Sequence, residues 1–133
     1  MQSIAEQAEK NIQRLSKKEF RGEKKVKLSK SQIRKILSSV IRIENKVTGL
    51  TSDAQNSDAL PEEIVEEIDY LKVRIAYQVG RDSGREKLVK EFVDKTDLLS
   101  WISGIQGSKK RFLQFSRYVE ALVAYHRYYG GDD

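Results

Sequence analysis

Residues 108–131, SKKRFLQFSRYVEALVAYHRYYGG, decide the fold because they are rich in aromatic side chains. The whole chain has six Tyr, four Phe and one Trp, and six of these eleven residues lie in this stretch. On a helix with about 100° per residue, the large apolar side chains and one histidine fall in a single stripe. This stripe consists of Phe112, Phe115, Val119, Leu122, His126 and Tyr129. Ser108 can cap the start of the helix, and Gly130 can end it. The pattern predicts a long helix whose aromatic side packs into a core.

Two further long helices are predicted from their boundary residues. Ser29 and Gln32 have the spacing of a capping box, in which each side chain satisfies a backbone N–H of the first turn. The apolar residues that follow recur at helical spacing up to residue 47. Pro61 suits the first position of a second long helix, which we expect to end near Gly80.

Shorter apolar stretches complete the bundle. One helix is predicted over residues 85–95, and a second over DLLSWISGIQG, ending near Gly104 or Gly107. The chain is therefore expected to be all-α, a compact bundle of about five helices. Residues 29–131 would form one domain and residues 132–133 a tail.

The N-terminal segment differs from the rest in charge. Residues 1–30 carry nine Lys/Arg and four Asp/Glu, whereas residues 31–133 carry sixteen of each, so the whole net charge of +5 belongs to the start of the chain. Residues 3–19 have helical spacing, but a short polar helix is marginal by itself in water. We expect residues 1–28 to form a mobile, basic, partly helical arm, and we predict no strand anywhere in the chain.

The composition excludes several classes of site. The chain has no cysteine and a single histidine, His126, which rules out disulfides, thiolate metal sites and multi-histidine metal sites. We expect His126 to be a hydrogen-bonded, half-buried residue and not a catalytic one. No apolar run approaches the roughly 18 residues of a membrane span, and the first residues lack the apolar core of a secretory signal. The prediction is a cytoplasmic protein that is not an enzyme and has no cofactor, metal or membrane contact.

The second long helix has two apolar faces. One face is formed by Ile64, Ile68, Leu71 and Ile75. The other, nearly opposite, is formed by Tyr70, Val73 and Tyr77. Such a helix is either central in a bundle or shares one face with a partner. We favour the central position, because core contacts are commoner than interfaces.

Cations and small polar residues share the face of the first long helix that points away from its apolar stripe. These residues are Lys35, Ser38, Arg42, Asn45 and Lys46. On the last helix, Lys110 and Arg117 lie opposite the aromatic stripe. The residues alone allow two interpretations, a solvated helix surface or a surface that contacts phosphates.

Three segments together resemble one known family. IDYLKVRIAYQVGR (68–81), VKEFV (89–93) and KKRFLQFSRYVEALVAYHRYYGG (109–131) resemble the small subunit of the type III-A CRISPR Csm effector complex. The resemblance covers roughly residues 28–131 and does not place the lysine-rich residues 1–27, whose role stays open. It implies a compact bundle of about five helices without an active site, present in several copies along a ribonucleoprotein filament used in antiviral defence.

The resemblance also implies partners and binding residues. The partners would be guide RNA, target RNA, neighbouring copies and other subunits of the complex, including the backbone and large subunits. The RNA-binding residues carried over from the matching motifs are Arg34, Lys35, Lys72, Arg74, Arg81, Lys109, Lys110 and Arg117. Arg42 and Lys46 join this set because they lie on the basic face of the first long helix.

Three other functions remain as alternatives. The first is a helical protein–protein adaptor that does not bind nucleic acid, which the second apolar face of residues 70–77 favours. The second is a DNA-binding protein that uses its basic N-terminal segment, although no helix pair shows a polar recognition face. The third is a nuclease, for which the chain offers no cluster of carboxylates beside a base.

Overall fold

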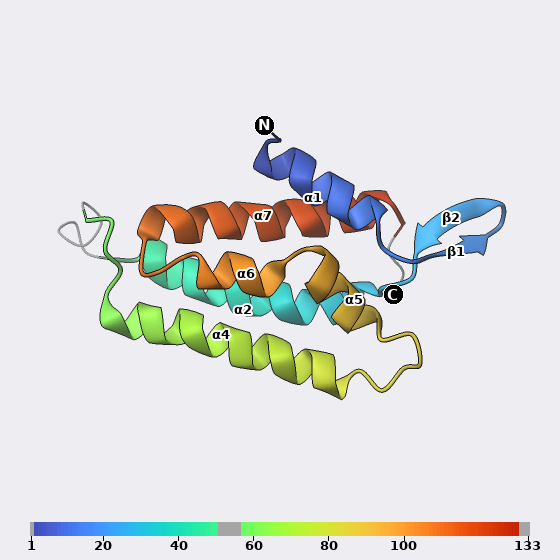
Figure 1. Cartoon of the computed structure of the whole chain (residues 1–133). Coiled ribbons are helices and arrows are strands. Elements are labelled where there is room, and N and C mark those ends of the chain that lie inside the picture. Colours follow the sequence, from blue (N-terminus) through green and yellow to red (C-terminus); the bar gives the residue numbers. More distant parts are fainter. Residues whose placement is uncertain (1, 51–56, 131–133) are drawn as a thin grey trace.

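The helix α7 (Lys109–Tyr128) runs along the molecule, and the other elements pack on it or beside it (Figure 1). The computed structural model describes residues 2–50 and 57–130. Its other elements are the helices α1 (Ile4–Gln13), α2 (Lys30–Thr48), α4 (Glu62–Arg81), α5 (Leu88–Lys95) and α6 (Leu98–Ser103) and the strands β1 (Lys17–Phe20) and β2 (Glu23–Val26). The predicted helical bundle is confirmed, and the predicted tail at residues 132–133 lies outside the described residues.

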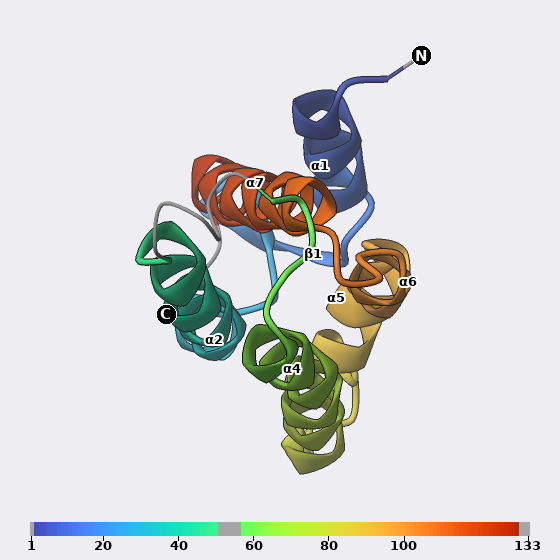
Figure 2. The same cartoon turned by 90° about the vertical axis from the view of Figure 1, so that its left-hand side faces the viewer.

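Seen end-on, the long helices and the α5–α6 pair surround a common core (Figure 2). α7 packs on α2, α2 on α4, α4 on α5 and α6, and α6 on α7. α1 lies on the outer side of α7, away from α4. Apolar side chains from every described helix and from β2 contribute to the buried cluster, which makes a rigid frame for the surface residues.

The start of α2 has the capping box that the sequence predicts. Ser29 Oγ accepts a hydrogen bond from the backbone N–H of Gln32 at 3.2 Å, and Gln32 Oε1 accepts one from the backbone N–H of Ser29 at 3.0 Å. The capping box thus satisfies two of the backbone N–H groups at the helix start that have no partner within the helix. The apolar stripe that follows is buried and consists of Ile33, Ile36, Val40, Ile43 and Val47.

The junction between α4 and α5 differs from the prediction. α4 does not end at Gly80 but continues for one more residue. α5 begins later than predicted because Lys87 has a left-handed backbone, with φ 50° and ψ 53°. The carboxylate of Asp82 stabilises this junction by accepting hydrogen bonds from the backbone N–H groups of Gly84 at 3.3 Å and Val89 at 3.0 Å.

The aromatic stripe of α7 lies in the core, as predicted. Its buried members are Phe112, Phe115, Val119, Leu122 and His126, and Tyr129 is partly buried. Tyr118 is also fully buried. Its ring stacks on Trp101 of α6 with 4.3 Å between ring centroids, and its hydroxyl donates a hydrogen bond to the carbonyl oxygen of Thr96 at 2.7 Å.

The N-terminal segment contains the helix foreseen within residues 1–28, but it packs on the bundle. Ala8 and Ile12 of α1 have no exposed surface. Asn11 Nδ2 donates a hydrogen bond to the Tyr118 hydroxyl at 2.8 Å. The sequence predicted a mobile arm up to residue 28 and a bundle that begins at residue 29. In the structure, residues on both sides of this boundary share one core. Although the segment is polar overall, one face of α1 is apolar enough to cover α7.

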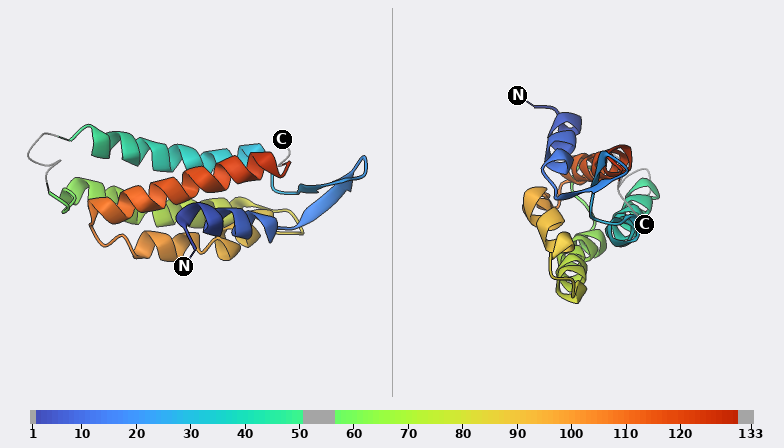
Figure 3. Two further views of the ribbon diagram at one scale, coloured as in Figure 1. Left: turned by 90° about the horizontal axis from the view of Figure 1, so that it is seen from above. Right: turned by 90° about the vertical axis from the view of Figure 1, so that its right-hand side faces the viewer.

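The prediction that the chain contains no strand is wrong. β1 and β2 form an antiparallel hairpin in which Lys17 lies opposite Val26. Its turn residues Arg21 and Gly22 both have positive φ, 53° and 82°, as a tight two-residue hairpin turn requires. The hairpin extends beyond the end of the bundle (Figure 3). It is fixed at its base, where the backbone N–H of Val26 donates to the carbonyl oxygen of Tyr129 at 3.3 Å.

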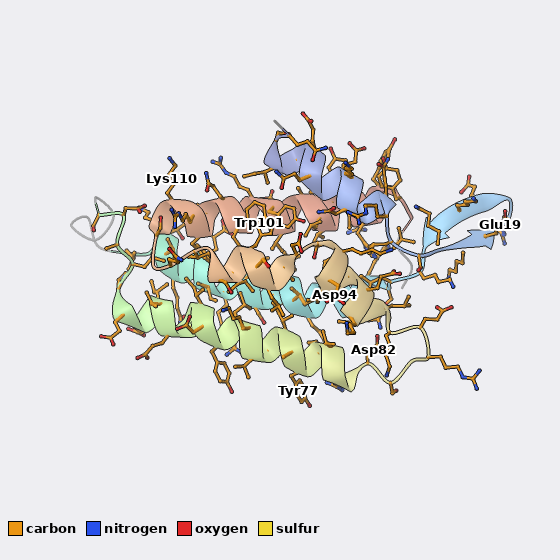
Figure 4. The ribbon with its side chains drawn as sticks, in the orientation of Figure 1. Glu19, Tyr77, Asp82, Asp94, Trp101 and Lys110 are labelled. Atoms are coloured by element: carbon orange, nitrogen blue, oxygen red, sulfur yellow. The ribbon has the colours of Figure 1, made fainter. Side chains whose placement is uncertain are left out.

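The outer apolar face of α4 is exposed. Tyr70, Val73 and Tyr77 keep 56%, 52% and 63% of their surface accessible, and Figure 4 shows Tyr77 pointing away from the bundle. The prediction that α4 is a central helix with both apolar faces covered is therefore wrong. Its buried face is the one formed by Ile64, Ile68, Leu71 and Ile75.

Candidate nucleic-acid interface

Four of the ten predicted RNA-binding residues are exposed on α2: Arg34, Lys35, Arg42 and Lys46. Lys35, Arg42 and Lys46 share one side of the helix, the α2 basic face, and Arg34 lies about 100° around the helix from Lys35. The three residues occupy this face because the opposite stripe of α2 is buried. The Lys46 ammonium forms an ion pair with Glu67 Oε1 of α4, so part of its charge is neutralised within the chain.

Two adjoining grooves between α2 and α4 bring three predicted cations together. The larger groove, of about 330 Å³, is lined by Lys35 and Arg74 among others. The smaller groove, of about 210 Å³, is lined by Lys35 and Arg81. Lys35 therefore stands where the two grooves meet, with one arginine of α4 in each of them.

A third groove, of about 100 Å³, lies between α2 and α7 and contains two cations that the sequence did not predict. Arg34 lines it together with Lys30 and Arg127. Arg127 was missed because the helical pattern of α7 places it between the core stripe and the opposite face. Only the neighbouring α2 shows that it belongs to a groove. Lys30 was missed because it was counted with the N-terminal segment.

A fourth groove, of about 460 Å³, lies beside the start of α7. Lys109, Lys110 and Arg117 line it, together with Ser57 and Asp58. Lys110 and Arg117 are exposed and Lys109 is half-buried. The structure thus places these three predicted residues around one groove.

The N-terminus of α7 already holds an anionic group of the protein itself. Asp58 Oδ1 accepts a hydrogen bond from the backbone N–H of Lys110 at 2.9 Å, and Asp58 Oδ2 accepts one from the Ser108 hydroxyl at 2.7 Å. The bond from the Lys110 N–H, then that from Ser108, lowers the pKa of Asp58. This carboxylate occupies the position that an external phosphate could take at a helix start. A phosphate in this groove would therefore contact the side chains of the cations and not the backbone N–H groups at the start of α7.

Lys72 stands apart from the other predicted residues. It lies in a hollow between α4 and α6, next to Asp69 of the same helix, and it is half-buried. The structure does not bring it together with Arg74, although both belong to the same sequence motif. Residues two apart on a helix point in different directions.

The predicted residues as a whole do not form a single patch. Figure 4 shows Lys110 projecting from the start of α7 on one side of the molecule and Tyr77 projecting from α4 on the opposite side. The cations instead form separate groups on several faces of the bundle.

His126 belongs to the core, beneath the groove between α2 and α7 that Arg34 lines. It has no exposed surface, and its Nε2 donates a hydrogen bond to the carbonyl oxygen of Leu28 at 2.6 Å. The predicted hydrogen bond is confirmed, but the residue is fully buried and not half-buried. Burial lowers the pKa of His126, and the charge of Lys30 lowers it further.

None of the helices in the described part of the chain combines the length and the apolarity needed to cross a lipid bilayer.

Comparison with known proteins identifies a family. Residues 3–132 match the model of the family Csm2 Type III-A. The CRISPR system Cms protein Csm2 of Mycobacterium tuberculosis is 40% identical over 103 residues, which are 76% of this chain and 74% of that protein.

Two further relatives carry the same name. The protein of Enterococcus italicus is 38% identical over 106 residues, covering 77% of this chain and 68% of that protein. The protein of Streptococcus thermophilus is 33% identical over 106 residues, covering 80% of this chain and 76% of that protein. The chain therefore belongs to the type III-A Csm2 family, the small subunits of CRISPR Csm complexes.

Proposed function

We propose that the protein is a non-catalytic subunit, present in several copies, that binds the backbones of guide RNA and target RNA without reading their sequence and stabilises the ribonucleoprotein filament in the cytoplasm. The observation that carries this proposal is the grouping of cations in the grooves on both sides of α2. They are Lys35, Arg74 and Arg81 on the α4 side, and Lys30, Arg34 and Arg127 on the α7 side.

Backbone contacts suit a subunit that has to accept any guide sequence. Lysine and arginine form ion contacts with phosphates, and these contacts position a strand without distinguishing its bases. Sequence recognition in RNA-guided complexes is supplied by base pairing between the guide and the target. Because the cations stand on helices that share one core, their spacing is fixed before RNA arrives.

The charge balance of the chain predicts weak binding by a single copy. Residues 31–133, which include all ten predicted RNA-binding residues, carry as many acids as bases, so this part of the folded chain adds no net charge to the +5 of the N-terminal segment. We expect an isolated copy to bind a short RNA more weakly than about 1 μM at physiological salt. Several copies along one strand would give strong attachment because each bound copy raises the effective concentration of the next.

The test is a charge-removal variant in the assembled complex. Its substitutions, together called the groove variant, are Arg34→Ala, Lys35→Ala, Lys110→Ala and Arg117→Ala in the grooves and Arg42→Ala on the α2 basic face. The matched control removes the same charge from exposed residues outside the grooves, by Lys10→Ala, Arg14→Ala, Lys24→Ala, Arg85→Ala and Lys87→Ala. The target RNA should be complementary to only part of the guide, so that pairing alone does not saturate binding. Assembly of both complexes is checked by size-exclusion chromatography.

Retention of RNA over a series of salt concentrations decides the outcome. The groove variant should bind more weakly, and the slope of log affinity against log salt should fall by about 0.7–0.9 for each phosphate that the variant no longer neutralises. The control should keep the wild-type slope. Equal losses in both variants would mean that only total charge matters. Unchanged binding in the groove variant, with assembly intact, would support the protein–protein adaptor, which the exposed face of α4 favours.

A further inference from the structure

The exposed tyrosines of α4 line the larger of the two α2–α4 grooves. Tyr70, Val73 and Tyr77 form its apolar part, and Lys35 and Arg74 stand beside them. Among the described residues, no acidic side chain lines this groove. Its volume of about 330 Å³ is at the lower end of the range for small-molecule sites, about 300–1,000 Å³. The groove therefore offers aromatic surface and positive charge on the scale of one nucleotide.

The smaller groove continues the first one with a different chemistry. It is lined by Lys35 and Arg81 and by the hydroxyl and amide groups of Ser31, Gln32 and Ser83. Cations with hydroxyl and amide donors are the groups that bind phosphate. The two grooves share Lys35 and Gln78, so an aromatic half and a phosphate-binding half adjoin.

The carboxylate in the smaller groove is already engaged. Asp82 is the acid among the described residues that line it. Its two oxygens accept the backbone N–H groups of Gly84 at 3.3 Å and Val89 at 3.0 Å. Part of its negative charge is therefore directed into the α4–α5 junction, which reduces its repulsion of an anion held by Arg81.

The ring of Tyr70 has a defined neighbour. The guanidinium carbon of Arg74 lies 5.4 Å from the ring centroid, within the range of a cation–π contact. Tyr77 follows seven residues after Tyr70, which places both on the same side of α4 two helical turns apart. Tyrosines held on a helix lose little conformational freedom when a flat ligand stacks on them.

We propose that this pair of grooves holds an unpaired nucleotide of RNA, with the base stacked on the tyrosines and the adjoining phosphate bound by Lys35 and Arg81. This inference deepens the proposed function and rests on it, because it adds a base-stacking site to the backbone contacts. Stacking does not distinguish bases, since every base has an aromatic face, so the site remains compatible with any guide. A purely apolar protein segment would fill the tyrosine half but would leave the cationic half without an anion.

The first experiment maps the contact in the assembled complex. Complexes are formed on a guide RNA that contains 5-iodouridine and are irradiated, and the crosslinked peptides are identified by mass spectrometry. We expect crosslinks within residues 70–81 in the wild type and in Y70F/Y77F, which keeps the aromatic rings. Crosslinks should be lost in Y70L/Y77L, which keeps apolar volume but removes the rings. Equal crosslinking at this segment in the leucine variant would overturn the proposal.

The second experiment measures affinity with the full-length protein at low salt. The probes are a short oligouridine and a fully paired RNA duplex, and folding of each variant is checked by thermal unfolding. The leucine variant should lose about fivefold or more in oligouridine affinity and bind the duplex like the wild type. The phenylalanine variant should stay within about twofold of the wild type for both probes.

The outcomes separate this inference from the proposed function. If K35A/R81A weakens oligouridine binding while Y70L/Y77L leaves it unchanged, no base stacks here and the backbone contacts stand. If neither variant weakens oligouridine binding, the nucleotide site in these two grooves is refuted, and the five-substitution groove variant decides the proposed function separately. If Y70L/Y77L retains oligouridine but no longer assembles with the other subunits, the grooves dock a protein, and the nucleotide site is refuted.

Discussion

The Nε2 atom of His126 donates a hydrogen bond to the carbonyl oxygen of Leu28 at 2.6 Å, and this bond joins the end of α7 to the segment between β2 and α2. The histidine has no exposed surface, and its Nδ1 has no hydrogen-bond partner among the described residues. A proton on Nδ1 would therefore introduce a buried charge without compensation. Burial accordingly lowers the pKa of His126 below its ordinary value of 6.5.

This lowered pKa predicts that the protein loses stability as the pH falls below about 6.5. In that range the unfolded chain binds a proton that the folded chain does not, so the free energy of unfolding decreases until the pH passes the folded pKa. Urea unfolding at a series of pH values measures the effect. His126→Gln, which keeps a donor for Leu28, should flatten the curve between about pH 5 and 7. Identical pH profiles for both proteins would show that another group is responsible.

The carboxylates act in a separate, more acidic range. Burial raises the pKa of Glu91, but the two hydrogen bonds from Ser16 outweigh it, and the net pKa lies below the ordinary 4.5. The stability that Glu91 contributes is therefore present above this value and is lost only as the pH falls below it. Protonation of Glu91 should therefore not change the free energy of unfolding in the higher pH range in which His126 acts.

The hydroxyl of Tyr118 predicts a measurable loss on Tyr118→Phe. It donates to the carbonyl oxygen of Thr96 and accepts from Asn11, and the residue is fully buried. Removing it leaves both partners unsatisfied, which should reduce the free energy of unfolding by about 1–3 kcal/mol. Tyr128→Phe is the matched control, because Tyr128 is 77% exposed, and it should change stability by less than about 0.5 kcal/mol. Equal effects in chemical denaturation would contradict the role assigned to Tyr118.

Two glycine substitutions should act in opposite directions. Gly130 has φ +83°, and a Cβ there would lie 2.9 Å from Lys25 Cγ, so Gly130→Ala should destabilise the protein by about 1–3 kcal/mol through backbone strain and displacement of the lysine. Gly80 lies within α4 with open space around it. Gly80→Ala should stabilise by roughly 0.5–1 kcal/mol, since alanine is the better helix former. Thermal unfolding of both variants tests the pair, and a stable Gly130→Ala protein would be inconsistent with the close contact to Lys25.

Two lysines of the α2 basic face should differ in their importance for RNA. Lys46 forms an ion pair with Glu67, whereas Lys35 lies where the two α2–α4 grooves meet. Lys35→Ala should lower the salt dependence of RNA binding by the complex by about 0.7–0.9 in slope. Lys46→Ala should change it less. The ranking would be refuted if filter binding over a salt series gave the larger change for Lys46→Ala.

The sequence predicted those features that depend on local chemistry. The capping box of Ser29 and Gln32 and the cap at Ser108 are local hydrogen-bond patterns, and both helices begin where these residues stand. The β1–β2 hairpin was missed because its turn is Arg21–Gly22 and not one of the usual Asn-Gly or Asp-Gly pairs. Its lysine-rich strands also lack an alternation of apolar and polar residues.

The grouping of the cations could not be predicted because it depends on which helices are neighbours. Arg34 and Lys35 are adjacent in sequence, yet Arg34 lines the groove beside α7 and Lys35 lines those beside α4. In the same way, the pattern of α4 shows two apolar faces but does not reveal which of them the rest of the chain covers. That choice is made by the packing of α2, α5 and α6.

The contribution of the first 28 residues to the core sets the shortest piece of this chain that can be produced as a stable protein. A version that begins at Ser29 would expose the side of α7 on which α1 packs. It would also lose the Leu28 carbonyl oxygen that accepts the hydrogen bond of His126. It would also delete buried side chains at Ala8, Ile12 and Val26. Trimming the chain to residues 29–131 would thus yield an aggregation-prone fragment, and recombinant work should keep the basic N-terminus attached, which the family model also covers.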